Sequence, residues 1–399
     1  MKKINVILLL AAFFIVCNVG YCGTVAPPYQ VGTWSGFRTA AVSYVSDAGY
    51  LSNLYTIAVP MFNSYGFKLS MFEIPNWNPP WSSVQAAVAQ GHEASSLLMD
   101  HGNLPDMNET QATWELSQSQ IVINSYIQPG SQCLIVGYPN CNIAYKSLIA
   151  QYYIAARTCG VSINPSTPPD FYAIDSLIVG SATTQGLNST AGFITKDNQA
   201  ASMGGWVVYL VHDINNQGGY SPISATILNE SLQYLDNNRN TFWVQNFGNV
   251  VRYIKERNDA SVSETSNTGD TITLSVTDTL NDVNYCYPIT IRRPLPAGWG
   301  SANVSQNGLP VPSSIVKVNS TAYVMFDVVP DRGEVVLSRG IYGDFTGDGV
   351  VDMNDLSGFL KFWLVNDCNG IVGLDVDEDC VVNFDEFAVL AESWRQEPS

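Results

Sequence analysis

The sequence predicts three folded units in series: an α/β barrel, an antiparallel β-sandwich and a small all-α unit. Between about residues 24 and 258, short apolar strands alternate with segments of helical periodicity. From residue 259 to 340 the chain is rich in Thr, Ser and Val, and it carries period-two stretches such as "DTITLSVTD" and "YVMFDVV". After residue 340, two acidic segments repeat with a period of 31 residues. A chain of 399 residues is long enough for several such cores.

Residues 1–22 have the features of a secretory signal peptide. Two lysines precede an apolar run over residues 4–16, and small residues follow up to Cys22. The run is too short to cross a membrane comfortably, and no later stretch is long enough, so we expect no membrane span. The sequence therefore predicts a secreted or extracellular protein, or one held at the cell surface through a partner. A lipoprotein site at Cys17 is the alternative.

Six cysteines remain after Cys22, and export permits them to form disulfides. The local pairings to expect first are Cys141 with Cys159 and Cys368 with Cys380, although sequence does not determine connectivity. No Cys-x-x-Cys or Cys/His grouping indicates a zinc site.

The first unit, residues 24–258, shows the alternation that favours a parallel α/β barrel. Its expected buried strands are residues 40–45, 68–74, 133–138 and 206–212. A helix is expected after Ser224, because four aliphatic residues fall on one face: Ile227, Leu228, Leu232 and Leu235. The segment "WVQNFGNVVRYIKER" predicts one more strand and a final helix.

Polar side chains follow three of these strands. Asp47 follows "AVSYV", the turn "GYPN" follows "CLIV", and His212 follows "WVVYLV". In α/β barrels the functional side chains gather at the carboxyl ends of the strands. A carboxylate base facing a histidine acid suits hydrolysis of an amide or an ester. The structural alternative is an aspartate that caps a helix and a histidine that is a satisfied core residue.

The order of five segments gives these residues a context. "AAVSYVSDAGY", "SYGFKLSMFEIP", "GHEASSLLMDH", "GYPNC" and "GGWVVYLVHDI" resemble, in order, the landmarks of the polysaccharide deacetylase (NodB-homology) family over about 230 residues. The resemblance implies an irregular (β/α) barrel that removes acetyl groups from chitin-like, peptidoglycan-like or xylan-like polymers. It also implies a divalent metal, held by one Asp and two His, that activates water.

The resemblance implies roles for individual residues. Asp47 matches the catalytic base, and His212 matches the general acid. The turn that ends in Asn140 matches the segment whose backbone amide supports the oxyanion, although Gly137 stands where that motif has an arginine.

The metal ligands are where the sequence departs from the family. Ala48 stands in place of the ligand Asp, Leu97 replaces the first ligand His, and only His101 matches the second. Methyl and isobutyl groups donate no electron pair, and a catalytic site of this type needs three protein ligands. The sequence therefore argues against a transition metal in the barrel and predicts an impaired deacetylase. The alternative is a site rebuilt with His92, Asp100 or Asp47.

The C-terminal unit, residues 341–397, contains two loops with the oxygen spacing of calcium-binding loops. The first offers Asp344, Thr346, Asp348, Val350, Asp352 and Asp355, and the second offers Asp375, Asp377, Asp379, Val381, Asn383 and Glu386. The repeat resembles a dockerin module with two calcium sites, which implies a cohesin-like partner. A solvated acidic tail is the alternative. The charge from residue 341 onward is −11 of a total of −17, which opposes nucleic-acid binding.

Three functions remain open on the sequence: an impaired enzyme acting on an acetylated polysaccharide, an inactive carbohydrate-binding protein, and an assembly component recruited through the C-terminal module. Four tryptophans of the first unit are candidates either for stacking on sugar rings or for the core, and the sequence does not separate the two: Trp34, Trp77, Trp81 and Trp206.

Overall fold

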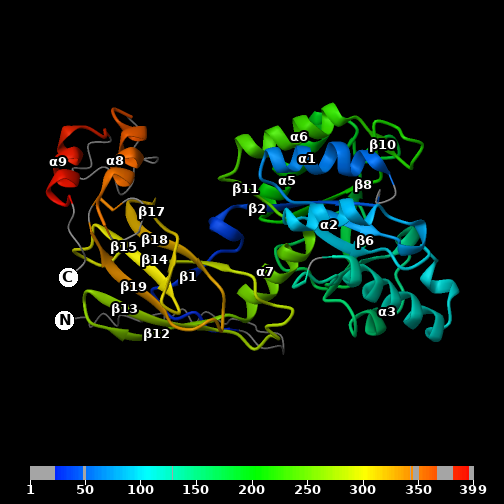
Figure 1. Cartoon of the computed structure of the whole chain (residues 1–399), viewed down its shortest axis with the longest axis horizontal. Coiled ribbons are helices and arrows are strands. Elements are labelled where there is room, and N and C mark those ends of the chain that lie inside the picture. Colours follow the sequence, from blue (N-terminus) through cyan, green and yellow to red (C-terminus); the bar gives the residue numbers. More distant parts are fainter. Residues whose placement is uncertain are drawn as a thin grey trace, which may run out of the picture.

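The computed structural model describes residues 23–47, 51–127, 129–341, 343–344, 350–365 and 381–394 (Figure 1). The expected signal peptide, Ala48 and the expected Cys368–Cys380 pair lie outside these ranges. Within them, every helix is too short or too polar to cross a membrane.

The first unit is a closed ring of seven parallel strands. In order around the ring these are β2 (Ala40–Ser46), β3 (Ser70–Glu73), β4 (Glu93–Ser96), β5 (Ile135–Gly137), β6 (Ala155–Cys159), β7 (Ile174–Ile178) and β8 (Trp206–Val211), and β8 pairs with β2. An eighth strand, β11 (Phe242–Val244), pairs with the first half of β2, while β3 pairs with its last two residues. This shared edge makes the ring irregular. The four expected strands and the expected parallel barrel are confirmed.

Helices surround the ring. They are α1 (Val59–Ser64), α2 (Trp81–Ala89), α3 (Glu109–Tyr126), α4 (Lys146–Ile149), α5 (Thr190–Met203), α6 (Ala225–Asn237) and α7 (Phe247–Asp259), with a π-helical segment η2 (Leu54–Ala58) before α1. Ser224 caps α6 by accepting from the Thr226 amide, which confirms the helix expected there. Short 3-10 turns are η1 (Ser35–Phe37), η3 (Pro75–Trp77), η4 (Leu104–Asp106) and η5 (Pro139–Cys141).

The second unit consists of two antiparallel sheets. One contains β12 (Ser261–Asn267), β13 (Thr271–Thr277), β19 (Val335–Gly340), β15 (Ser301–Gln306) and β16 (Leu309–Val311). The other contains β1 (Gln30–Val31), β14 (Ile289–Pro294), β18 (Thr321–Val328) and β17 (Ser313–Val318). Burial alternates along β13, as the period-two pattern of its sequence requires. Strand β1 comes from the segment that the sequence analysis assigned to the barrel, because two residues are too few to show a period.

Helix α7 lies between the barrel and the second unit (Figure 1). Phe247 and Val250 on this helix share one hydrophobic cluster with Ile289 and Ile291 of β14. The Tyr253 hydroxyl donates to the carbonyl of Gly32, 2.8 Å away. The two units are therefore joined by a buried contact and by a chain connection.

The described part of the C-terminal unit contains two short helices, α8 (Met353–Phe359) and α9 (Phe384–Glu392), with the 3-10 turn η6 (Leu360–Phe362) after α8. They enclose a small core of four side chains: Val351, Phe359, Val382 and Leu390. The backbone of Leu364 donates to the carbonyl of Val382 at 2.7 Å and so links the two halves.

Candidate active site

Asp47, Arg157 and His212 meet at the carboxyl ends of the barrel strands. Asp47 directly follows β2, and His212 directly follows the neighbouring strand β8. The Nε2 atom of His212 lies 3.8 Å from Oδ2 of Asp47. On its other side, Oδ1 of Asp47 forms an ion pair with Arg157 of β6. Parallel strands bring these residues to one rim although more than 100 positions separate Asp47 from Arg157.

Arg157 is the site residue that sequence reasoning missed. Its side chain is only 1% exposed, and its guanidinium lies 4.4 Å from the centre of the Phe72 ring. In the sheet register it is opposite Gly137. A Cβ at Gly137 would lie 3.0 Å from Nη2 of Arg157, so the glycine leaves the room that the guanidinium fills. The resemblance implies an arginine at position 137, and here a guanidinium from the next strand lies beside Gly137. A lone arginine within the apolar stretch "IAARTC" was the available signal.

A disulfide fixes the strand ends beside Arg157. Cys141 of η5 and Cys159 of β6 are bonded, with their Cα atoms 5.1 Å apart, which confirms the expected pairing. The Thr158 hydroxyl donates to the carbonyl of Cys141 at 2.9 Å and supports the same contact. Cys133 and Cys286 have free thiols, the first buried and the second exposed.

Both histidines near Asp47 are held toward the neutral form. Burial lowers the pKa of His212, and Arg157 and His101 lower it further, while Asp47 opposes them. Burial likewise lowers the pKa of His101, with Asp47 raising it and Arg157 lowering it. The Nδ1 atom of His212 is buried and has no hydrogen-bond partner among the described residues. None of the described residues therefore selects the tautomer of His212 through Nδ1.

The expected ligand positions do not fit a catalytic metal. Leu97, which directly follows β4, is 1% exposed, and its Cδ1 lies 2.7 Å from where a Cβ of Gly137 would stand. Ala48 is outside the described residues, and its methyl group has no donor atom. Among the barrel residues that the structure describes, no three imidazole, thiol or carboxylate groups converge closely enough to share a metal ion. His101 alone is the imidazole remnant of the expected set.

The residues considered for a rebuilt site make other contacts. Burial lowers the pKa of His92 to about 4. Its Nδ1 accepts from the Leu69 amide at 3.2 Å, and its Nε2 lies 3.2 Å from Oδ1 of Asn63. Asp100 accepts a hydrogen bond from Asn76. These contacts give no support to a rebuilt metal site.

The turn after β5 lies on the same rim as Asp47. Asn140 is exposed and adopts a left-handed backbone conformation with φ of 54°. Tyr138 points into the core, where its hydroxyl donates to the Tyr172 carbonyl at 2.9 Å. An oxyanion role for the backbone at Asn140 stays a prediction.

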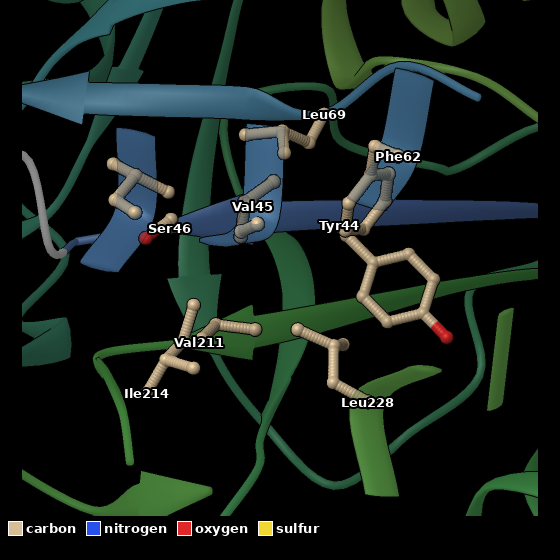
Figure 2. Close-up of a pocket in the computed structure, with 10 residues that line it drawn as sticks. Tyr44, Val45, Ser46, Phe62, Leu69, Val211, Ile214 and Leu228 are labelled. Atoms are coloured by element: carbon tan, nitrogen blue, oxygen red, sulfur yellow. The ribbon is translucent and has the colours of Figure 1, made fainter. Parts of the chain in front are cut away.

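A small cavity of about 10 Å³, roughly the room that one water molecule needs, lies beside the site (Figure 2). Ser46 and Val211, the residues before Asp47 and His212, contribute to its wall together with Tyr44 and Phe62. The exposed part of this lining is apolar, so it offers little for the hydroxyl groups of a sugar. The cavity is therefore a feature of the core beneath the rim.

The tryptophans divide into core and surface residues. Trp34 and Trp206 are fully buried, and Trp81 stacks on Tyr126 with ring centres 4.2 Å apart. Trp77 is 45% exposed, and its ring lies 5.5 Å from that of His101. Of the four candidates, Trp77 combines exposure with contact to the site.

Some of the expected calcium ligands fall within the described residues. Asp355 and Glu386, at the last position of each loop, are buried and accept from the backbone amides of Asp352 and Asn383, at 2.8 Å each. Asp344, Val350 and Val381 are also described. Five expected donors lie outside the described residues: Thr346, Asp348, Asp375, Asp377 and Asp379. Calcium binding by the two loops stays a prediction.

Comparison with known proteins agrees with this geometry. Residues 37–152 match the family model described as "Polysaccharide deacetylase". A gellan lyase from Bacillus sp. is 26% identical over 326 residues, which cover 77% of this chain, and the chain spans 13% of that protein's length.

Solved structures with weak similarity include the CE4 domain of a multidomain xylanase from the hindgut metagenome of Trinervitermes trinervoides. It is 17% identical, with a TM-score of 0.38, and the match covers 53% of this chain and 89% of that chain. A CE4 family pseudoenzyme from Bacillus anthracis has 10% identity, a TM-score of 0.39, and coverage of 54% and 66%. The residues that match the family model, 37–152, include Asp47, Leu97 and His101.

Proposed function

We propose that this protein is an exported member of the polysaccharide deacetylase group whose metal-dependent removal of acetyl groups is impaired. The observation that carries the proposal is the pair of apolar residues, Ala48 and Leu97, at positions where the resemblance implies metal ligands, which leaves His101 as the one implied ligand in the sequence. Loss of the metal removes the activation of water and the polarisation of the acetyl carbonyl, which are worth several kcal/mol of barrier.

The remaining groups form an acid–base pair without an electrophile. Arg157 holds the Asp47 carboxylate, which leaves Oδ2 facing His212. Burial lowers the pKa of His212, so less of the protonated ring is present at neutral pH to donate a proton than for an ordinary histidine. Asp47 and His212 alone therefore supply little acceleration.

Restoring the ligands tests the proposal. We expect no metal-dependent acetate release from an acetylated oligosaccharide by the parent chain, and measurable release by the double variant Ala48→Asp, Leu97→His. Metal-dependent release by the parent that is abolished by Asp47→Asn would contradict the proposal. Metal content of both purified proteins separates failure to bind metal from failure of catalysis.

Exposed aromatic rings beside the site favour a second function, binding of the polysaccharide without hydrolysis. Trp77 is 45% exposed next to His101, and Tyr220 is 55% exposed with its ring 4.9 Å from that of His212. Such rings can cover the apolar face of a sugar. In affinity electrophoresis with an acetylated polysaccharide, Trp77→Ala is expected to reduce retardation. The matched control is Trp114→Ala, which removes a ring that is 48% exposed on α3. Equal retardation of both variants would count against binding at this rim.

The C-terminal module adds a third candidate function, recruitment into an assembly. We propose that two calcium ions order residues 341–397 and that a cohesin-like protein binds them. The two capping boxes at the ends of the loops, which begin at Asp352 and Asn383, repeat the same local geometry and support this proposal. Calcium-dependent binding of the full chain to an immobilised cohesin domain, lost in Asp355→Asn with Glu386→Gln, is the expected result. Binding that survives chelation would refute it.

A further inference from the structure

The loop that follows His212 carries an aromatic ring to the candidate site. It runs between the short parallel strands β9 (Asp213–Ile214) and β10 (Pro222–Ile223). Within it, Tyr220 is 55% exposed, and its ring meets the His212 ring edge-to-face with the ring centres 4.9 Å apart. We call residues 214–221 the Tyr220 loop. Its sequence, "INNQGGYS", contains no charged side chain, so the exposed ring stands among uncharged groups.

The backbone of the Tyr220 loop adopts uncommon conformations. Asn215, Asn216 and Ser221 have φ angles of 59°, 57° and 47°, in the left-handed region that residues other than glycine rarely occupy. Gly218 has a φ angle of 93°. Such backbone persists only where the surrounding contacts fix it, and it is concentrated at ligand-binding and active sites. The contacts that hold this loop therefore bear on its function.

Asp213 is the main anchor of the loop. Its side chain is fully buried, and each of its carboxylate oxygens accepts from a backbone amide: Oδ1 from Gln217 at 3.0 Å and Oδ2 from Gly219 at 2.8 Å. Position 219 leaves no room for a side chain, because a Cβ there would lie 2.8 Å from Cδ1 of Leu51 and 3.1 Å from Cβ of Asp213. One carboxylate thus fixes the backbone immediately before Tyr220.

Two further side chains tie the loop to its neighbours. Gln217 accepts from the backbone amide of Asn53 and donates to the hydroxyl of Ser52, at 2.8 Å each, and both partners lie between β2 and η2. At the other end of the loop, the Ser221 hydroxyl donates to the carbonyl of Val179 at 2.7 Å, directly after β7. The exposed ring therefore lies in a segment that is fixed on both sides before any ligand binds.

We propose that Asp213 is a positioning residue that holds Tyr220 against His212 as a preformed subsite for one neutral sugar ring. The role rests on the polysaccharide binding proposed for this rim and names the residue that builds part of it. A ring that is fixed in advance loses little conformational freedom when a ligand binds, which raises affinity. The apolar face of a sugar can cover the tyrosine ring, and the uncharged loop beside it suits a neutral polymer.

NMR of the full chain measures the position of Tyr220 without a ligand. A ring 4.9 Å away changes the chemical shifts of the His212 ring protons, and with three histidines in the chain these signals can be assigned through His212→Gln. Spectra are recorded above the pH at which the histidines titrate, and Tyr220→Ala removes the ring-current shift. We expect Asp213→Asn to move the His212 signals most of the way to their position in Tyr220→Ala, because asparagine keeps only one oxygen for two amides.

A second variant loosens the same loop from its surface. Gln217→Ala removes the bonds to Ser52 and Asn53 and replaces an exposed side chain, so it should fold even if Asp213→Asn does not. We expect it to move the His212 signals in the same direction. Folding of both variants is checked by circular dichroism. Signals that keep the parent position in the folded variants overturn the proposal.

Affinity electrophoresis with an acetylated polysaccharide tests whether Asp213 acts through Tyr220. Asp213→Asn and Tyr220→Ala are each expected to weaken binding about two- to tenfold. The double variant should bind no more weakly than Tyr220→Ala alone, whereas the effects of Asp213→Asn and Trp77→Ala should multiply. Effects of Asp213→Asn and Tyr220→Ala that multiply overturn the positioning role.

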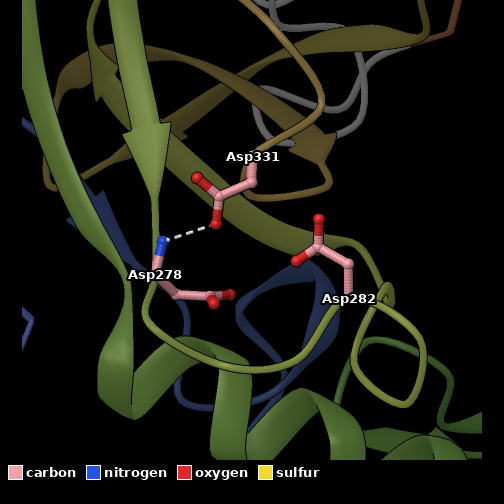
Figure 3. Close-up of side chains that lie close together, drawn as sticks. All are labelled: Asp278, Asp282 and Asp331. Carbon is pink, nitrogen blue, oxygen red and sulfur yellow. Dashed lines mark hydrogen bonds between the residues drawn. The ribbon is translucent and has the colours of Figure 1, made fainter.

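The matched control is Asp331→Asn in the sandwich. Oδ2 of Asp331 accepts from the backbone amide of Asp278 at 3.0 Å, so this variant also weakens an aspartate that holds a turn (Figure 3). It should leave the His212 signals and the binding unchanged. A parent chain that is not retarded by the polysaccharide overturns the proposed binding function and the subsite with it. Normal retardation that Asp213→Asn leaves unchanged overturns only the role of Asp213.

Discussion

The variant Arg157→Met tests how much the buried ion pair between Arg157 and Asp47 contributes to the free energy of unfolding. Methionine keeps the unbranched stem and removes the guanidinium, so Asp47 loses its ion-pair partner. The Asp47 side chain is 11% exposed, and burial, the largest cause of the lowered pKa of His212 3.8 Å away, persists in the variant, so His212 is expected not to replace the cation. Removing one partner of a buried ion pair lowers the free energy of unfolding by about 3–5 kcal/mol. Because Asp47 keeps some exposure to solvent, we expect a loss at the lower end, about 3 kcal/mol.

This loss is measurable by urea denaturation of the full chain followed by far-UV circular dichroism. For a unit of this size, about 3 kcal/mol corresponds to a fall in Tm of about 6–12 °C. The control is Arg239→Met, which removes an arginine paired with Asp236 at the surface and should cost less than about 1 kcal/mol.

A double variant tests the reason for the loss. Arg157→Met with Asp47→Asn removes both charges and should recover most of the lost stability, because no unpaired charge stays buried. The reasoning would be refuted if Arg157→Met cost less than about 1 kcal/mol, or if the losses of the two single variants simply added.

Three further predictions concern the barrel. Burial raises the pKa of Glu73 to about 7 despite the hydrogen bond from Tyr55, so the native state keeps a proton that the unfolded chain releases near pH 4.5. The stability that this proton contributes is therefore lost as the pH rises from about 4.5 through 7. The variant Glu73→Gln should make the free energy of unfolding less dependent on pH in this range. Gly137→Ala places a Cβ 2.7 Å from Leu97 and should cost about 1–3 kcal/mol by denaturation, and a cost near zero would show that the neighbours move freely. Replacing Cys141 and Cys159 by serine should cost about 3 kcal/mol for a loop of this length, and an unchanged denaturation midpoint would show that the bond adds nothing.

The strands and the first disulfide could be predicted because their signals are local. A buried parallel strand is a continuous apolar run, as at residues 40–45 and 206–212, and it keeps that pattern whatever its neighbours are. Cys141 and Cys159 lie at the ends of adjacent strands, so their disulfide can be expected without knowing the rest of the barrel. Strand β1 has no such signal, because two residues acquire strand geometry only from the sheet that they join.

Sequence by itself determined that positions 48 and 97 have no side-chain atom that could donate an electron pair to a metal. This follows from the residue types, alanine and leucine, whatever surrounds them in the fold. Tertiary structure decided what stands around Asp47. Arg157 reaches Asp47 because the register of β5 with β6 and the closure of the ring bring distant strands to one rim. Such contacts depend on burial and register over the whole fold, and no local pattern encodes them.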